Sequence, residues 1–169
     1  MVLTKEELIS SLQNEVRILL HLTTKVDRNQ LDYRPTLKQR STLELLRYLT
    51  IMGPALIPAI KTGTFDGAAF GAAQAAANAM NFDQVIAAIE KLSGSFAEQL
   101  GAFSDADFRE QLDMFGQKAS RGSHLVSLVL SGHAAYRTQL FCYLKACGRD
   151  ELSTWNLWGG VDAPAQAAS

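Results

Sequence analysis

The residues best suited to chemistry gather in one segment, residues 131–140, whose sequence is SGHAAYRTQL. An imidazole at His133 and a guanidinium at Arg137 lie four positions apart, so in a helix they are neighbours on the surface. Together they could donate hydrogen bonds to an anionic or polar small molecule. They cannot form a metal site with each other, because Arg137 is a permanent cation that does not coordinate.

Two thiols, Cys142 and Cys147, follow in the same predicted helix. At about 100° per residue they point about 140° away from one another, which prevents a disulfide between them. We therefore predict two buried thiols that pack as small apolar side chains.

Other catalytic signatures do not occur in the sequence. There is no Gly-x-Ser-x-Gly elbow, no phosphate-binding glycine loop, no Cys-x-x-Cys pair and no Glu-x-x-His signature of haem or di-iron bundles. These absences exclude common motifs without excluding activity.

Four long amphipathic segments must position the residues named above. Apolar residues recur at helical spacing in residues 4–26, 41–61, 81–103 and 123–147. This pattern predicts an all-α fold, an antiparallel four-helix bundle, with a connection between the second and third helices that is long enough for a crossover. Three of the helices begin with a capping box, formed by Thr4 with Glu7, Ser41 with Glu44, and Asn81 with Gln84.

The segments between the helices are predicted to be irregular or only weakly helical. Residues 27–40 break the helical period, and Gly53-Pro54 predicts a kink or a restart in the second helix, because proline lacks a backbone N–H. The alanine-rich residues 67–80 predict one or two loose turns that cover a bundle end or a partner subunit. Residues 104–107 predict a short helical turn, and residues 112–122 an irregular segment.

The last residues, 149–169, carry Trp155 and Trp158 without any helical period. We predict a domain at residues 1–148 and a tail at 149–169 that docks through its tryptophans, on the domain or on a partner subunit.

The net charge of −1 predicts no nucleic-acid partner and no attraction to an anionic membrane, since both need clustered Lys and Arg. The N-terminal residues lack the basic and apolar regions of a signal peptide. We expect that no apolar run approaches the roughly 18 residues of a membrane-spanning helix. The cytoplasm is the expected location.

The second and fourth predicted helices resemble the DinB-like family, which includes metal-dependent thiol transferases related to bacillithiol transferase. A family motif Ser-(x)6-His-Leu in the second helix supplies one metal ligand, and here Ser41 precedes Tyr48-Leu49. A motif His-(x)3-His-Arg-Gly-Gln in the fourth helix supplies two more, and here the matching residues end in Arg137-Thr138-Gln139. Residues 31–35, LDYRP, also look like the family's link between helices 1 and 2, and the resemblance spans residues 5–148.

The three ligand positions that the resemblance implies fall on Tyr48, Gly132 and Tyr136, so none is a histidine. A glycine offers no donor, and a tyrosine must lose a proton with a pKa of about 10. We therefore expect a degenerate metal site and no metal cofactor. Shifting the match by one residue makes His133 a ligand, but it then places Arg137 and Arg47 at the other two positions.

Helical periodicity predicts which of these residues face the bundle interior. With Gly132 at zero, Leu125, Tyr136 and Tyr143 lie within about 40° of it, whereas His133 lies about 100° away. Tyr48 and Tyr136 then either pack as core aromatics, or line a pocket with Gly132 whose rim carries His133 and Arg137. His124 and His21 have no partner that the sequence identifies.

Three functions are compatible with this sequence. The chain is a DinB-like protein of unassigned activity that binds a small molecule in the bundle pocket, or a thiol-dependent transferase or isomerase that uses Arg137 beside a thiolate. In the third, it is a homodimeric interaction protein without catalysis. Whether the chain is an enzyme is left open.

Overall fold

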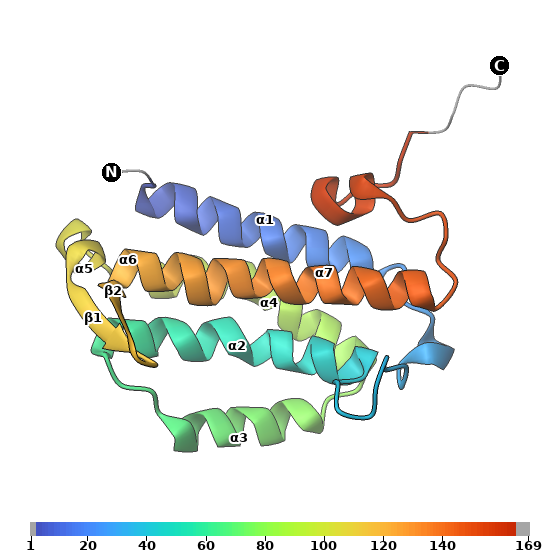
Figure 1. Cartoon of the computed structure of the whole chain (residues 1–169), viewed down its shortest axis with the longest axis horizontal. Helices are drawn as coiled ribbons and strands as arrows, with labels where there is room; N and C mark the ends of the chain where they lie inside the picture. The colour runs from blue at the N-terminus through green and yellow to red at the C-terminus, as the bar shows by residue number, and fades with distance from the viewer. Residues whose placement is uncertain (1–2, 165–169) are drawn as a thin grey trace.

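Four long helices form the body of the protein, which a computed structural model describes over residues 3–164 (Figure 1). They are α1 (Lys5–Thr23), α2 (Thr42–Thr62), α4 (Phe82–Gly101) and α7 (Ser131–Ala146). The chain reaches α7 through α6 (Arg121–His124) and the π-helical segment η2 (Leu125–Leu130). The predicted all-α bundle is confirmed, as are the three capping boxes. Residues 1–2 and 165–169, the ends of the predicted domain and tail, lie outside the described residues.

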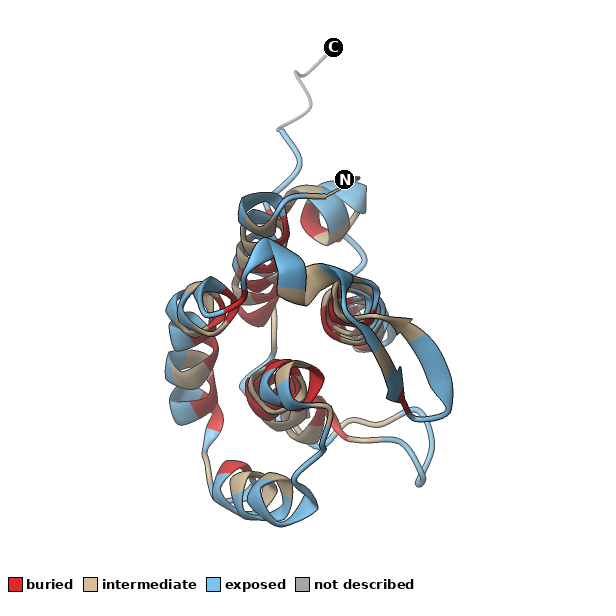
Figure 2. Cartoon of the chain, turned by 90° about the vertical axis from the view of Figure 1, so that its left-hand side faces the viewer, coloured by how far each residue is buried: buried red, intermediate tan, exposed pale blue. Residues whose placement is uncertain are grey.

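The helices are not arranged in simple up-down order. α1 and α2 each pack against both α4 and α7. The chain returns along α3 (Gly67–Asn78), so that α2 and α4 run in the same direction, while α1 and α7 run the opposite way (Figure 1). The buried residues of the four helices face one another across the centre of the bundle (Figure 2). The long connection is therefore the crossover that its length predicted.

α3 is longer than the one or two turns predicted, and it lies along α2 instead of at a bundle end (Figures 1 and 2). The Asp66 side chain caps its N-terminus by accepting a hydrogen bond from the Ala69 N–H at 2.9 Å. Alanine has the highest helix propensity, so a capped alanine run forms a helix with little burial. Ala77 is its one buried residue.

α2 runs without interruption through Pro54 and Pro58, so the predicted restart does not occur. Both prolines and Thr50 line a cavity beside α3, on the less tightly packed side of the helix. The expectation that no apolar run approaches membrane-spanning length was wrong for α2. By length and composition alone, this helix is long and apolar enough to cross a membrane. However, 56% of that stretch is buried within the protein, as expected of a core helix.

The predicted irregular segment contains a β-hairpin, which follows the short helix α5 (Asp105–Arg109) that the sequence predicted. Strands β1 (Gln111–Met114) and β2 (Gln117–Ser120) pair antiparallel, with Met114 opposite Gln117. The connecting residues Phe115 and Gly116 have φ angles of 54° and 78°. The strands are too short to show a period of two in the sequence.

The tail packs on the bundle through Leu152 and through several hydrogen bonds. Leu152 and Asn156 are buried, and Arg17 of α1 donates hydrogen bonds to the carbonyls of Gly159 and Gly160 at 2.9 and 3.3 Å. Trp155 and Trp158, in the π-helical turn η3 (Trp155–Gly159), are 51% and 70% exposed. Docking on a partner subunit stays a prediction, as does the homodimer.

Candidate functional site

A cavity of about 580 Å³ lies between α2 and the helix formed by η2 and α7. Residues of α3, of the loop before it and of the β-hairpin line its outer side. Its lining is aromatic, aliphatic and hydroxyl-bearing, and none of the twelve described residues that line it is charged. They are Tyr48, Met52, Leu56, Phe65, Phe70, Phe115, Ser127, Leu128, Ser131, Gly132, Ala135 and Tyr136.

The three residues at the implied ligand positions all line this cavity. The rings of Tyr48 and Tyr136 meet edge to face, with centroids 5.1 Å apart and planes at 74°. A Cβ added at Gly132 would lie 3.1 Å from Cε of Met52, so the glycine lets this side chain reach the α7 backbone. Tyr48 from α2 and Gly132 and Tyr136 from α7 thus line the same cavity.

The donor set at these positions does not fit a divalent metal ion. Burial, followed by the neighbouring Tyr136, raises the pKa of Tyr48, although the Arg40 guanidinium acts in the opposite direction. A phenol that is harder to ionise is a poorer metal ligand, and Gly132 provides no side-chain donor. Within residues 3–164, no three His, Cys, Asp or Glu side chains lie close enough together to hold a metal ion.

Arg40 and Gln139 fix the end of the cavity near the start of α2. The Arg40 guanidinium lies over the Tyr48 ring, 3.9 Å from its centroid. The Arg40 carbonyl accepts a hydrogen bond from the Tyr143 hydroxyl at 3.0 Å, and this hydroxyl accepts one from the Gln139 amide. Gln139 therefore supports, through the Tyr143 hydroxyl, the anchoring of the loop before α2.

The outer side of the cavity is formed by three phenylalanines from separate segments. Phe65 lies 5.4 Å from Phe70 of α3 and 6.1 Å from Phe115 of the hairpin, measured between ring centroids. The sequence did not identify these residues, because nothing in a single sequence brings a loop, a helix and a hairpin turn together. The dipeptide Phe115-Gly116 was the one local signal, since a glycine there favours a tight turn.

His133 does not lie at the rim of the cavity, where the sequence placed it. It is 1% exposed and packs edge to face on Phe96, with ring centroids 5.3 Å apart. Its Nε2 lies 2.9 Å from where a Cβ at Gly53 would stand, so only glycine admits the imidazole here. Among the described residues, this Nε2 has no hydrogen-bond partner.

The π-helical segment explains why His133 faces the core. Its i→i+5 hydrogen bonds put more residues in each turn, so successive residues rotate by less than 100°. Residues four positions apart then lie on the same face of the helix. Gly132 consequently lies farther from the buried face than it would in a regular α-helix. The buried face of this helix consequently carries Leu125, Val129, His133, Arg137, Leu140, Tyr143 and Leu144.

The buried imidazole of His133 should make the protein sensitive to mild acid. Burial lowers the pKa of His133 from 6.5 to about 4. The unfolded chain binds a proton below pH 6.5 whereas the folded chain does not until about pH 4, so stability falls as pH decreases across this window. The shift corresponds to about 3 kcal/mol. We expect His133→Leu to remove this part of the pH dependence.

Urea unfolding of both proteins between pH 7 and pH 4 measures the effect, since all other titrating groups are shared. The difference in unfolding free energy between variant and wild type should change by about 3 kcal/mol over the window. If the unfolding free energies of the wild type and of His133→Leu change equally with pH, the imidazole is not held neutral by burial.

Arg137 also lies away from the cavity, in the interface between α7, α1 and the tail. Its side chain is 3% exposed, and Nε and Nη2 donate to the two carboxylate oxygens of Glu15 at 2.6 and 3.2 Å. Nη1 donates to the Leu157 carbonyl, and the guanidinium lies 5.8 Å from the Trp158 ring. All three guanidinium nitrogens are therefore used in the structure, and none faces a position for a thiolate.

The other histidines and the cysteines occupy separate places. His124 is buried, with Nε2 at 3.1 Å from the Leu112 carbonyl, and His21 lies 3.1 Å from the Asn156 amide of the tail. Cys142 and Cys147 are free. The prediction that both are buried was wrong, because Cys142 lies on the outer side of α7 and is exposed, while Cys147 is half-buried.

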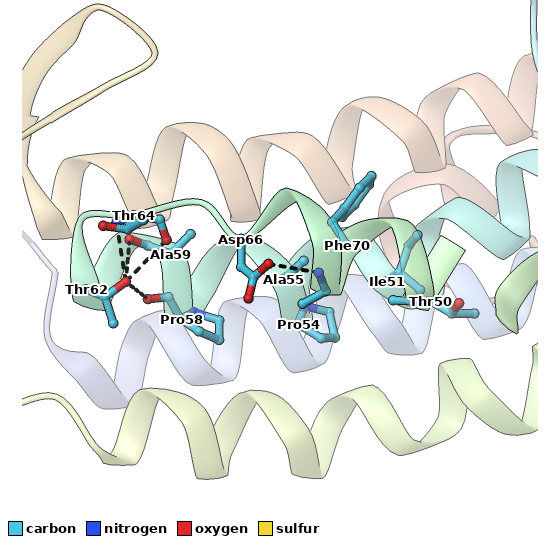
Figure 3. Close-up of a pocket in the computed structure, with 12 residues that line it drawn as sticks. Thr50, Ile51, Pro54, Ala55, Pro58, Ala59, Thr62, Thr64, Asp66 and Phe70 are labelled. Atoms are coloured by element: carbon cyan, nitrogen blue, oxygen red, sulfur yellow. Dashed lines mark hydrogen bonds between the residues drawn. The ribbon is translucent and has the colours of Figure 1, made fainter. Parts of the chain in front are cut away.

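A second cavity of about 590 Å³ lies between α2 and α3 (Figure 3). Thr50, Pro54 and Pro58 line it from α2, and Phe70 is among the residues that line it from α3. Each proline deprives the carbonyl four residues earlier of its helical donor. Phe70 lines both cavities, so this ring is a wall shared between them.

Comparison with known proteins identifies the fold. No protein-family model matches the sequence, and no curated protein is significantly similar to it. The structure is similar to the crystal structure of YjoA, a DinB-like protein from Bacillus subtilis, with a TM-score of 0.64. The match covers 86% of this chain and 94% of YjoA at 17% sequence identity, so the chain has the DinB-like fold.

Proposed function

We propose that this chain, which has the DinB-like fold, binds a small molecule without a metal ion in the cavity between α2 and α7. The observation that carries this proposal is that Tyr48, Gly132 and Tyr136 line one cavity together. The positions implied for metal ligands thus hold two phenols and a glycine against which Met52 packs. A volume of about 580 Å³ lies within the range of small-molecule sites.

The ligand differs from the anionic molecule that the sequence suggested. His133 and Arg137 lie outside the cavity, so the donors available to a ligand are hydroxyls. Tyr48 and Tyr136, which carry two of these hydroxyls, are half-buried, whereas Ser127 and Ser131 are exposed. A ligand that hydrogen-bonds to neutral hydroxyls and fills apolar space suits this lining best.

Gly132→Leu is expected to block the cavity while leaving the bundle folded. The new Cβ would meet the Sδ and Cε atoms of Met52, which are the movable end of a flexible side chain. A thermal-shift screen of fragment-sized compounds should find ligands that raise the unfolding temperature of the wild type by about 5–10 °C at a hundredfold excess over Kd. The same compounds should leave Gly132→Leu unshifted.

Thr138→Leu is the matched control, because it adds the same side chain at an exposed position of α7 outside the cavity. It should respond to the compounds as the wild type does. Ligands that stabilise Gly132→Leu and the wild type equally would place binding elsewhere and contradict the proposal.

A further inference from the structure

We propose that the ligand of this cavity is an uncharged, planar aromatic compound held between the phenylalanines of the outer side and the tyrosine pair. The inference rests on the proposed function and deepens it by naming the class of ligand. It is carried by the conformation of Phe115, by the arrangement of five aromatic rings and by the absence of charge from the described lining.

Phe115 occupies a backbone conformation that disfavours it. Residues 115 and 116 form a two-residue hairpin turn with both φ angles positive, the geometry of a type I′ turn. Asparagine followed by glycine is strongly preferred in this turn, and a bulky side chain at positive φ is an outlier. Strain of this kind persists at binding sites where a side chain is needed in a particular place.

Neither the turn nor the core accounts for the Phe115 ring. It is 66% exposed, so its burial contributes little to folding. The ring nevertheless lines the cavity and packs against Phe65, which is 37% exposed and packs in turn on Phe70. The position of the Phe115 ring at the outer side of the cavity is explained if a bound molecule covers this ring.

The five rings around the cavity present several orientations to a flat ligand. The Phe65 and Phe115 planes are inclined at 62° and the Tyr48 and Tyr136 planes at 74°. Edge-to-face and offset-stacked contacts with such rings favour an aromatic partner over an aliphatic one. An aromatic compound therefore gains contacts that a saturated molecule of the same size would lack.

The lining also selects against charge. None of the twelve described lining residues is ionic, so a charged ligand would lose part of its hydration without gaining a counter-ion from the lining itself. Burial raises the pKa of Tyr48, which keeps this phenol neutral and able both to donate and to accept a hydrogen bond. A single hydroxyl or amine substituent on the ligand would be satisfied there.

N-phenylnaphthylamine is a suitable probe, because it is uncharged and aromatic and its fluorescence rises in apolar sites. Anilinonaphthalene sulfonate is its matched control, with the same rings and one added negative charge. We expect the neutral probe to bind the wild type at least about tenfold more tightly than the sulfonate, counting only the signal that Gly132→Leu abolishes. Naphthol should displace the probe at roughly tenfold lower concentration than decahydronaphthol, its saturated analogue.

Phe115→Asn separates binding from folding. Asparagine suits the type I′ turn, so the unfolding temperature should equal or exceed that of the wild type, while affinity for the neutral probe falls roughly tenfold. Unchanged probe affinity in this variant would overturn the inference, as would equal displacement by the two naphthols, equal affinity for the two probes, or no binding of the neutral probe.

The two proposals fail in different ways. If Gly132→Leu prevents binding but the aromatic and uncharged compounds have no advantage, the cavity is the site and the ligand class is wrong. If the neutral probe binds Gly132→Leu as it binds the wild type, the cavity is not the site, and both proposals fail together.

Discussion

Replacing Tyr48, Gly132 and Tyr136 together by histidine is expected to create a three-histidine metal site at these positions. The three positions line one cavity, and the rings of the two tyrosines are already in contact. Neutral imidazole is a good ligand for zinc and nickel, and three such ligands match the protein donor count of many catalytic zinc sites. The triple variant should bind zinc with a Kd of about 1 μM or tighter, about −8 kcal/mol.

Titration calorimetry with zinc chloride on protein without an affinity tag measures the gain. The double variant Tyr48→His/Tyr136→His keeps Gly132 and should bind zinc more weakly, because it lacks one ligand. The wild type should give no heat that saturates at a stoichiometric ratio. A correctly folded triple variant that also fails to bind zinc would show that the three positions do not converge.

Arg137→Ala is expected to destabilise the bundle by about 3–5 kcal/mol, because it leaves the Glu15 carboxylate without its partner in a nearly buried position. The side chains of Arg137 and Glu15 are 3% and 12% exposed, and the pair is bidentate. The variant also frees the Leu157 carbonyl, so the tail should detach more readily. Urea unfolding gives the change in free energy.

The double variant Glu15→Leu/Arg137→Met tests whether the loss comes from the stranded charge. Apolar replacement of a buried ion pair is often neutral or stabilising, so the double variant should be more stable than Arg137→Ala. A loss below about 1 kcal/mol in Arg137→Ala would mean that the pair behaves like an exposed salt bridge.

The sequence predicted the bundle because its determinants are local. Capping boxes such as Ser41 with Glu44 and apolar stripes such as Val85, Ile89 and Leu92 act within one helix, and the structure confirms both. The match at Ser41, Tyr48 and Arg137 led to the DinB-like fold, which the structural comparison shows. The same match grouped Tyr48, Gly132 and Tyr136 as the implied ligand positions, and in the structure all three line one cavity.

The remaining features depend on tertiary structure that one sequence does not encode locally. The π-helical segment rotates His133 and Arg137 into the core, and no motif in LVSLVL predicts its hydrogen-bond pattern. Glu15, the partner of Arg137, is distant in sequence and was not identified. The outer side of the cavity likewise needs Phe65, Phe70 and Phe115, which come from three separate segments.

Elemental analysis of the wild-type protein, purified without an affinity tag from cells supplied with zinc, nickel and manganese, tests the central claim most directly. The claim is that two phenols and a glycine at positions 48, 136 and 132 do not hold a metal ion. We predict only trace, substoichiometric metal, unchanged by Tyr48→Phe. A stoichiometric transition metal, with X-ray absorption showing protein nitrogen ligands at about 2.1 Å, would contradict the claim.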